Sequence, residues 1–130
     1  TILKKACEQG VVLAGISAGS ICWFEEGLTD PLNGPLYKIN GLGFLLGSHC
    51  PHCDGEEKRR SSYQRMLITK EISAGYAVDD GAALHFINEK VSQTISSRPE
   101  AKAYYLINEN GRVVEEPMEA FYLGNKKLIL

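Results

Sequence analysis

The sequence contains no uninterrupted apolar run of the roughly 18 residues that would cross a membrane. Its N-terminus also lacks the basic-then-apolar pattern of a secretion signal. A formal net charge of only −2 gives no general attraction to nucleic acid or to an anionic membrane. Four cysteines are too few, and too irregularly spaced, for the disulfide framework of a small secreted protein. We therefore expect a cytoplasmic protein with reduced thiols, whose partner is a small molecule or peptide rather than nucleic acid or a membrane.

The 130 residues, 44% of them hydrophobic, fit one small domain. The chain begins at Thr1 rather than at a methionine, and its first ten residues have the pattern of a helix that closes at Gly10. We expect residues 1–130 to form a single domain that is the C-terminal part of a larger one.

Apolar stretches and helical patterns alternate along the first two thirds of the chain. The pattern predicts helices over residues 18–26 and 56–69, and strands over residues 11–15, 42–48, 73–78 and 82–87. Residues 28–43 are predicted to be a loop that has room for a short strand near residues 36–39. Further short strands are predicted at 91–96, 103–108, 112–115 and 121–123. This order predicts an α/β fold of three layers, with a mainly parallel sheet flanked by helices and short C-terminal strands.

A Gly-Ile-Ser-Ala-Gly-Ser segment joins the first predicted strand to the next helix. A tight turn of small residues around one serine, between strand and helix, is typical of a nucleophile elbow. Gly15 and Gly19 are expected to keep the neighbouring backbone clear of Ser17, the candidate nucleophile. The Ala18 N–H, next to it, is the candidate oxyanion donor. The alternative is an ordinary strand-to-helix turn with a serine N-cap.

A serine nucleophile needs a base, and the chain has three histidines. His85 lies within an apolar strand pattern, which is typical of a structural histidine. His49 and His52 follow the end of a predicted strand, the edge at which open α/β sheets hold their sites. His52 also follows Pro51, which stiffens the backbone beneath it.

Two further segments complete a recognisable set: Cys-Pro-His-Cys-Asp-Gly-Glu at 50–56 and Gly-Tyr-Ala-Val-Asp-Asp-Gly-Ala-Ala-Leu at 75–84. Together with the serine segment they resemble the serine peptidases of the peptidase E (aspartyl dipeptidase) and cyanophycinase group, over residues 1 to about 87. The resemblance implies a flavodoxin-like fold, close to that of class I glutamine amidotransferases. It also implies cleavage of small peptides, including N-terminal aspartyl dipeptides, through an acyl-enzyme and without a metal or organic cofactor.

The resemblance also implies roles for individual residues. Ser17 matches the nucleophile of the group, His52 the base and Asp80 the acid that orients it. Asp30 matches an alternative position for the acid. We favour Asp80, because a turn between two strands would hold its carboxylate more rigidly than the Pro/Gly-rich loop around Asp30. The structural alternative for Asp80 is a plain β-turn with solvated carboxylates.

The resemblance further suggests how the substrate and the oxyanion are bound. Arg59 and Arg60 are the arginines nearest to the place where a substrate carboxylate would be bound bidentately. The group places a second oxyanion donor on a glycine-rich loop upstream of the elbow, which this sequence does not contain. We therefore expect the 130-residue chain alone to have little or no peptidase activity.

Other interpretations stay open. Cys50-Pro51-His52-Cys53 has the Cys-x-x-Cys form of thiol–disulfide oxidoreductases, although nearby acids would raise rather than lower a thiol pKa. A zinc site from His49, Cys50, His52 and Cys53 would need four ligands within five residues to surround one ion. A catalytically inactive relic or binding domain is the remaining alternative.

Overall fold

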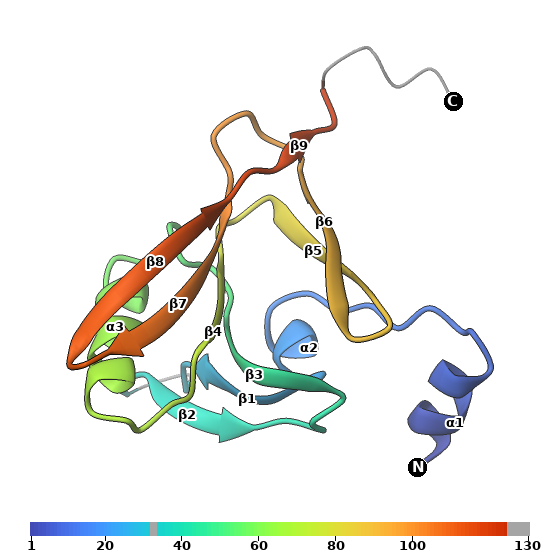
Figure 1. The fold of residues 1–130 in the computed structure, drawn as a ribbon, viewed down its shortest axis with the longest axis horizontal. Coiled ribbons are helices and arrows are strands. Elements are labelled where there is room, and N and C mark those ends of the chain that lie inside the picture. Colours follow the sequence, from blue (N-terminus) through green and yellow to red (C-terminus); the bar gives the residue numbers. More distant parts are fainter. Residues whose placement is uncertain (32–33, 125–130) are drawn as a thin grey trace.

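The computed structural model describes residues 1–31 and 34–124, and residues 32–33 and 125–130 lie outside the described part. Figure 1 shows the arrangement of its elements. The helices are α1 (Ile2–Glu8), α2 (Ala18–Ile21) and α3 (Arg59–Ile68). The strands are β1 (Phe24–Thr29), β2 (Tyr37–Asn40), β3 (Leu45–Cys50), β4 (Gly75–Val78), β5 (Ala82–Ile87), β6 (Lys90–Ser96), β7 (Ala103–Glu109), β8 (Arg112–Met118) and β9 (Phe121–Tyr122).

Six strands form the main sheet, in the order β2-β1-β3-β4-β7-β8. Its centre is parallel, since β3 pairs in parallel with both β1 and β4. The flanking strands β2, β7 and β8 run antiparallel to their neighbours. A second sheet has the order β5-β6-β9. The predicted α/β class is confirmed. The parallel strands β1, β3 and β4 occupy the centre of the main sheet, and the strands on either side of them are antiparallel.

Helices and strands cover both faces of the main sheet. In Figure 1, α3 lies over one face, while α2 and the β5–β6 hairpin lie on the other. The two-residue period of β3 sends alternate side chains to the two sides. Ser48 bonds to the Tyr63 hydroxyl of α3 at 2.6 Å, whereas His49 stacks on Phe24 with ring centroids 4.9 Å apart. The strand therefore contributes both to the core under α3 and to the face that carries α2.

The core under α3 is apolar and closed. Its buried members are Leu28, Cys50, Cys53, Tyr63, Met66, Leu67, Ile72, Ala77 and Leu106. On the opposite face, an aromatic contact joins the two sheets, because Phe86 of β5 packs edge-on against Phe24 and Tyr76 at centroid distances of 5.8 and 5.6 Å. This contact holds the turn between β4 and β5 in place at the end of the main sheet.

Two predicted elements are wrong. Residues 11–15 form no strand, because no other strand pairs with them among the described residues, and Val12 is 87% exposed. The helix predicted for 18–26 ends at Ile21, since Phe24 begins a strand that pairs on both sides and buries Phe24 and Leu28. Tertiary pairing there outweighs local helix propensity. Within the described residues, no helix is both long and apolar enough to span a membrane.

Candidate active site

Ser17 lies in a sharp turn between residues 11–16, which form neither helix nor strand, and α2. Its backbone has φ 55° and ψ −124°, a sparsely populated conformation for a residue with a side chain. A Cβ added to Gly15 would lie 1.8 Å from the Gly19 carbonyl oxygen, so the turn requires glycine at that position. A Cβ on Gly19 would meet nothing within 4 Å, and the steric role predicted for Gly19 is therefore wrong.

His52 is held in the loop that follows β3. It has a positive φ of 56° and follows the buried Pro51. The next residue ties the loop to the end of β4, because the Cys53 N–H donates to the Val78 carbonyl at 3.0 Å. The Gly55 N–H donates to the His52 carbonyl at 3.2 Å and closes the turn. The imidazole is thus fixed at the carboxyl end of the parallel strands β3 and β4.

These elements bring three predicted site residues into one chain of hydrogen bonds. His52 Nε2 lies 2.8 Å from Ser17 Oγ, and His52 Nδ1 lies 2.5 Å from Asp80 Oδ1. An ionised carboxylate can only accept, so Nδ1 carries the proton of the neutral ring. The Nε2 lone pair then faces the Ser17 hydroxyl, which is the arrangement required for a base that takes the serine proton.

Asp80 is positioned by residues that the sequence analysis did not single out. Its N–H donates to Asp54 Oδ1 at 2.8 Å, and its carbonyl accepts from Arg98 Nε at 2.7 Å. Arg98 also forms an ion pair with Asp54. Partial burial would raise the pKa of Asp54, but the bonds from Asp80 and Arg98 hold it below its usual value. A Cβ on Gly55 would lie 1.9 Å from Asp80 Oδ2, so glycine leaves room for the carboxylate.

Asp30 and the two predicted substrate-binding arginines have other partners. Arg59 is 1% exposed and bonds to Asp30, Glu56 and the Leu28 carbonyl. A buried guanidinium engaged on all three nitrogens cannot receive a substrate carboxylate, which argues against the predicted role of Arg59. The ion pair with Arg59 occupies the carboxylate of Asp30. Asp30 makes no contact with His52 among the described residues.

Arg60 is engaged in the same way. It pairs with Glu115 of β8 through both Nε and Nη2, and its guanidinium lies 4.5 Å from the centre of the Tyr104 ring. These contacts raise the pKa of Arg60 above its already high value, chiefly through the bonds to Glu115. A substrate carboxylate would have to displace Glu115. The carboxylate-binding role predicted for Arg60 therefore has no support in its position.

A second serine–histidine pair lies behind the first. His49 is 4% exposed, its Nε2 lies 2.9 Å from Ser20 Oγ, and its Nδ1 lies 3.1 Å from the Tyr76 carbonyl oxygen. Burial lowers the pKa of His49 to about 4, the bond to Tyr76 acts the other way, and His52 lowers it further. His49 is therefore neutral near pH 7. The sequence signal for this pair was the position of Ser20, one helical turn after Ser17.

The buried neutral state of His49 predicts acid sensitivity. From about pH 6.5 down to about pH 4, the unfolded chain binds a proton at His49 that the folded chain does not. The free energy of unfolding should therefore fall across this window, by roughly 3 kcal/mol in total. Urea titrations at about pH 7.5 and about pH 4.5 measure this loss. His49→Gln should lose clearly less stability between the two conditions, and an equal loss in both proteins would contradict the prediction.

The two cysteines next to His52 do not have the environment of a redox pair. Cys50 and Cys53 are buried free thiols. Burial raises the pKa of Cys53 to about 12 and raises that of Cys50 well above its usual value. Redox-active thiols have lowered pKa values. In addition, α3 begins only at Arg59. These observations argue against the thiol–disulfide interpretation.

The zinc interpretation has no better support. Its proposed ligands His49 and His52 each have both ring nitrogens in hydrogen bonds to other groups. Within the described part of the chain, no group of three His, Cys, Asp or Glu side chains is placed to hold a metal ion. Neither histidine ring is therefore available as a ligand in this arrangement.

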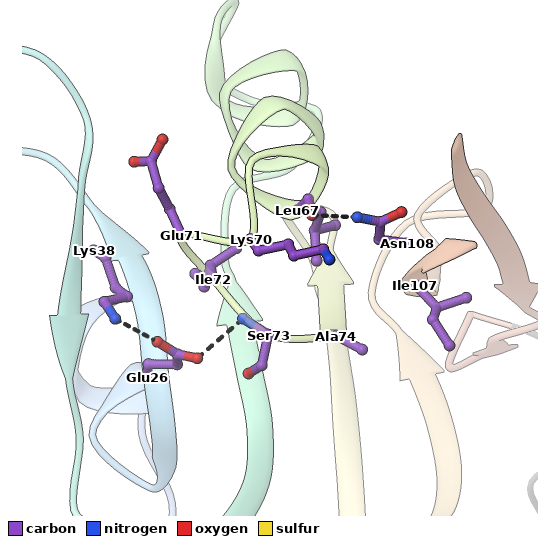
Figure 2. Close-up of a pocket in the computed structure, with 10 residues that line it drawn as sticks. All are labelled: Glu26, Lys38, Leu67, Lys70, Glu71, Ile72, Ser73, Ala74, Ile107 and Asn108. Atoms are coloured by element: carbon purple, nitrogen blue, oxygen red, sulfur yellow. Dashed lines mark hydrogen bonds and ion pairs between the residues drawn. The ribbon is translucent and has the colours of Figure 1, made fainter. Parts of the chain in front are cut away.

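A separate surface depression of about 400 Å³ lies elsewhere on the molecule, as Figure 2 shows. Its wall includes Ser73 and Ala74, at the amino end of β4, whereas Asp80 follows the carboxyl end of that strand. Glu26 in its wall pairs with Lys38 at 3.1 Å and accepts the Ser73 N–H at 3.0 Å. None of the residues in contact with His52 lines it, so we assign it no part in the site.

Comparison with known proteins agrees with this geometry. The model of peptidase family S51 matches residues 1–94, a range that contains Ser17, His52 and Asp80. The chain belongs to peptidase family S51. This membership confirms the family resemblance predicted from the sequence, and a flavodoxin-like fold is consistent with it. Arg98, which positions Asp80, lies beyond the matched range.

A curated relative is also named as a peptidase. The chain is 54% identical over 123 residues to the uncharacterized peptidase YgaJ of Bacillus subtilis (strain 168). The match covers 95% of this chain and 53% of the relative. The chain thus spans about half the length of this relative.

Proposed function

We propose that this chain carries the catalytic residues of a serine peptidase that cleaves small peptides through an acyl-enzyme. The observation that supports this function is the continuous set of hydrogen bonds from Ser17 through His52 to Asp80. Membership of a peptidase family supports the same reaction class. A turn with solvated carboxylates would not require the short contact between Asp80 and an imidazole.

In the proposed reaction, His52 Nε2 takes the hydroxyl proton of Ser17 as Oγ forms a bond to the peptide carbonyl carbon. Asp80 accepts from Nδ1–H throughout and stabilises the imidazolium. The C–N bond then breaks, and the leaving amine takes the proton from Nε2. In the second half, water gives a proton to His52 and attacks the acyl carbon. Ser17 recovers its proton when the acid product leaves.

The negative oxygen of the tetrahedral intermediate needs a fixed donor. The Ala18 N–H follows the nucleophile directly and makes no hydrogen bond to another described residue. Ala18 is exposed, so a substrate can reach this part of the turn. A donor of this type contributes about 2.7–4 kcal/mol to transition-state stabilisation in serine peptidases.

For the substrate we propose short peptides as a class. The N-terminal aspartate preference predicted from the sequence depended on Arg59 or Arg60 binding the substrate carboxylate. Arg59 is bound by Asp30 and Glu56, and Arg60 by Glu115. We therefore do not extend the proposal to aspartyl specificity.

An activated ester tests the proposed function in this chain, because it needs less oxyanion stabilisation than a peptide. With p-nitrophenyl acetate we expect a burst of nitrophenol that approaches one equivalent, and one acetyl group on Ser17 by mass spectrometry. Ser17→Ala should show neither. A folded wild-type chain that acquires no acetyl group on Ser17 would contradict the proposal and favour an inactive binding domain.

A further inference from the structure

The carbonyl of Ser17 is held by more donors than the first turn of a helix needs. It accepts from the backbone N–H of Ser20 at 2.9 Å and from that of Ile21 at 3.2 Å. It also accepts from the Ser20 hydroxyl at 2.6 Å. The third bond comes from a side chain, so its presence depends on the residue at position 20.

The direction of this carbonyl determines the direction of the neighbouring N–H. A trans peptide group is planar, so the Ser17 C=O and the Ala18 N–H point in opposite directions. With the carbonyl turned inward to α2, the N–H is turned outward beside the nucleophile. Because the backbone angles of Ser17 are strained, we expect this peptide group to rotate if the carbonyl loses its hydrogen bonds.

His49 holds the Ser20 side chain in position. The imidazole is buried, stacks on Phe24 and is bonded to the Tyr76 carbonyl of β4. Since that carbonyl can only accept, Nδ1 carries the proton and the Nε2 lone pair faces Ser20 Oγ. The single hydroxyl proton of Ser20 is therefore shared between the Ser17 carbonyl and His49 Nε2 in a three-centre bond. Both contacts require the Ser20 side chain to keep the same rotamer.

We propose that Ser20 and His49 are positioning residues that keep the Ala18 N–H aimed at the oxyanion. The inference rests on the proposed function, because it assigns a role within the same reaction. His49 acts through Ser20, and Ser20 acts through the peptide group that joins Ser17 to Ala18. Neither residue touches the substrate. Ser20 and His49 thus connect the site to β3, a strand that contributes no group to the reaction itself.

The rate at which a fluorophosphonate modifies Ser17 measures this effect, because phosphonylation also places negative charge on an oxygen near Ala18. In the 130-residue chain, Ser20→Ala should lower the maximal rate constant about tenfold, less than the 10²- to 10³-fold loss of a whole oxyanion donor. The concentration for half-maximal rate should not change. His49→Gln should give a smaller loss, because the Ser20 hydroxyl keeps its bond to the Ser17 carbonyl and loses only the contact that fixes its rotamer. The double variant should lose no more than Ser20→Ala, since His49 acts only through Ser20.

Ser61→Ala is a matched control, because the Ser61 hydroxyl also donates to a carbonyl three residues earlier, at 3.2 Å, on α3. It should label at the wild-type rate. A loss of fold alone would lower the final extent of labelling and leave the rate constant of the labelled fraction unchanged. If Ser20→Ala does not fold, His49→Gln provides the rate measurement.

Wild-type rates in Ser20→Ala and His49→Gln, or additive losses in the double variant, would overturn the inference and leave the proposed function intact. No labelling of Ser17 in the wild-type chain would overturn both. The two failures are therefore distinguishable.

Discussion

Replacing His52 with glutamine should lower the rate of acylation of Ser17 on the order of 10⁶-fold, the loss seen when a serine peptidase is deprived of its base. His52 is the only described group within hydrogen-bond distance of Ser17 Oγ that could take its proton. The amide of glutamine can bond to the hydroxyl but has no basic lone pair. The nitrophenol burst with p-nitrophenyl acetate is the measurement.

His85→Gln is the matched control for this variant. His85 is exposed on β5, and its only hydrogen bond among the described residues is a long contact to Gln93 at 3.4 Å. The control should acylate at the wild-type rate. If His52→Gln keeps its burst while His85→Gln loses it, the assignment of the base is wrong.

Asp80→Asn should lower the same rate on the order of 10⁴-fold, whereas Asp30→Asn should leave it nearly unchanged. The asparagine side chain can no longer stabilise the imidazolium of His52, and it favours the wrong tautomer. Asp30 bonds to the buried Arg59 instead, so its loss should appear in the urea midpoint rather than in the acylation rate.

This pair of variants decides between the two acids that the family resemblance allowed. Both changes remove one charge and keep the side-chain shape, so each serves as the other's control. A large loss of rate in Asp30→Asn, with a normal rate in Asp80→Asn, would reverse the assignment. Circular dichroism on both variants shows that the fold is retained.

The sequence indicated the site better than it indicated the elements that hold it. Three local patterns indicated the site: the small residues around Ser17, the Pro51-His52 pair and the Asp-Gly turn at Asp80. Each pattern contains residues whose backbone conformation favours a tight turn. Their meeting depends on β3 and β4 lying side by side with both carboxyl ends at one edge of the sheet. That arrangement follows from the α/β class, which was predictable.

Long-range partners explain what could not be predicted. Residues 11–15 read as a strand because they are apolar, but a strand also needs a neighbour to pair with. The helix predicted for residues 18–26 ends early because Phe24 begins β1, which pairs with both β2 and β3. The sequence indicates Arg59 as a ligand for a substrate carboxylate, yet Arg59 is buried and pairs with Asp30 and Glu56. The partner Asp30 lies 29 residues away in the sequence, so local pattern does not indicate it.

The residues that support the site could not be predicted either, because their contacts also depend on long-range partners. Arg98 reaches Asp80 from beyond the β5–β6 hairpin, and the interval of 18 residues shows no pattern. His49 meets Ser20 because alternate residues of β3 face opposite sides of the sheet. A correct register for β3 would have placed His49 towards α2 and away from the core under α3.

Peptide mapping after reaction with a fluorophosphonate tests the central claim most directly. We expect a single adduct on Ser17 in the wild-type chain, no adduct in Ser17→Ala, and greatly slowed modification in His52→Gln. The absence of an adduct on the folded wild-type chain, or an adduct on Ser20 in place of Ser17, would contradict it.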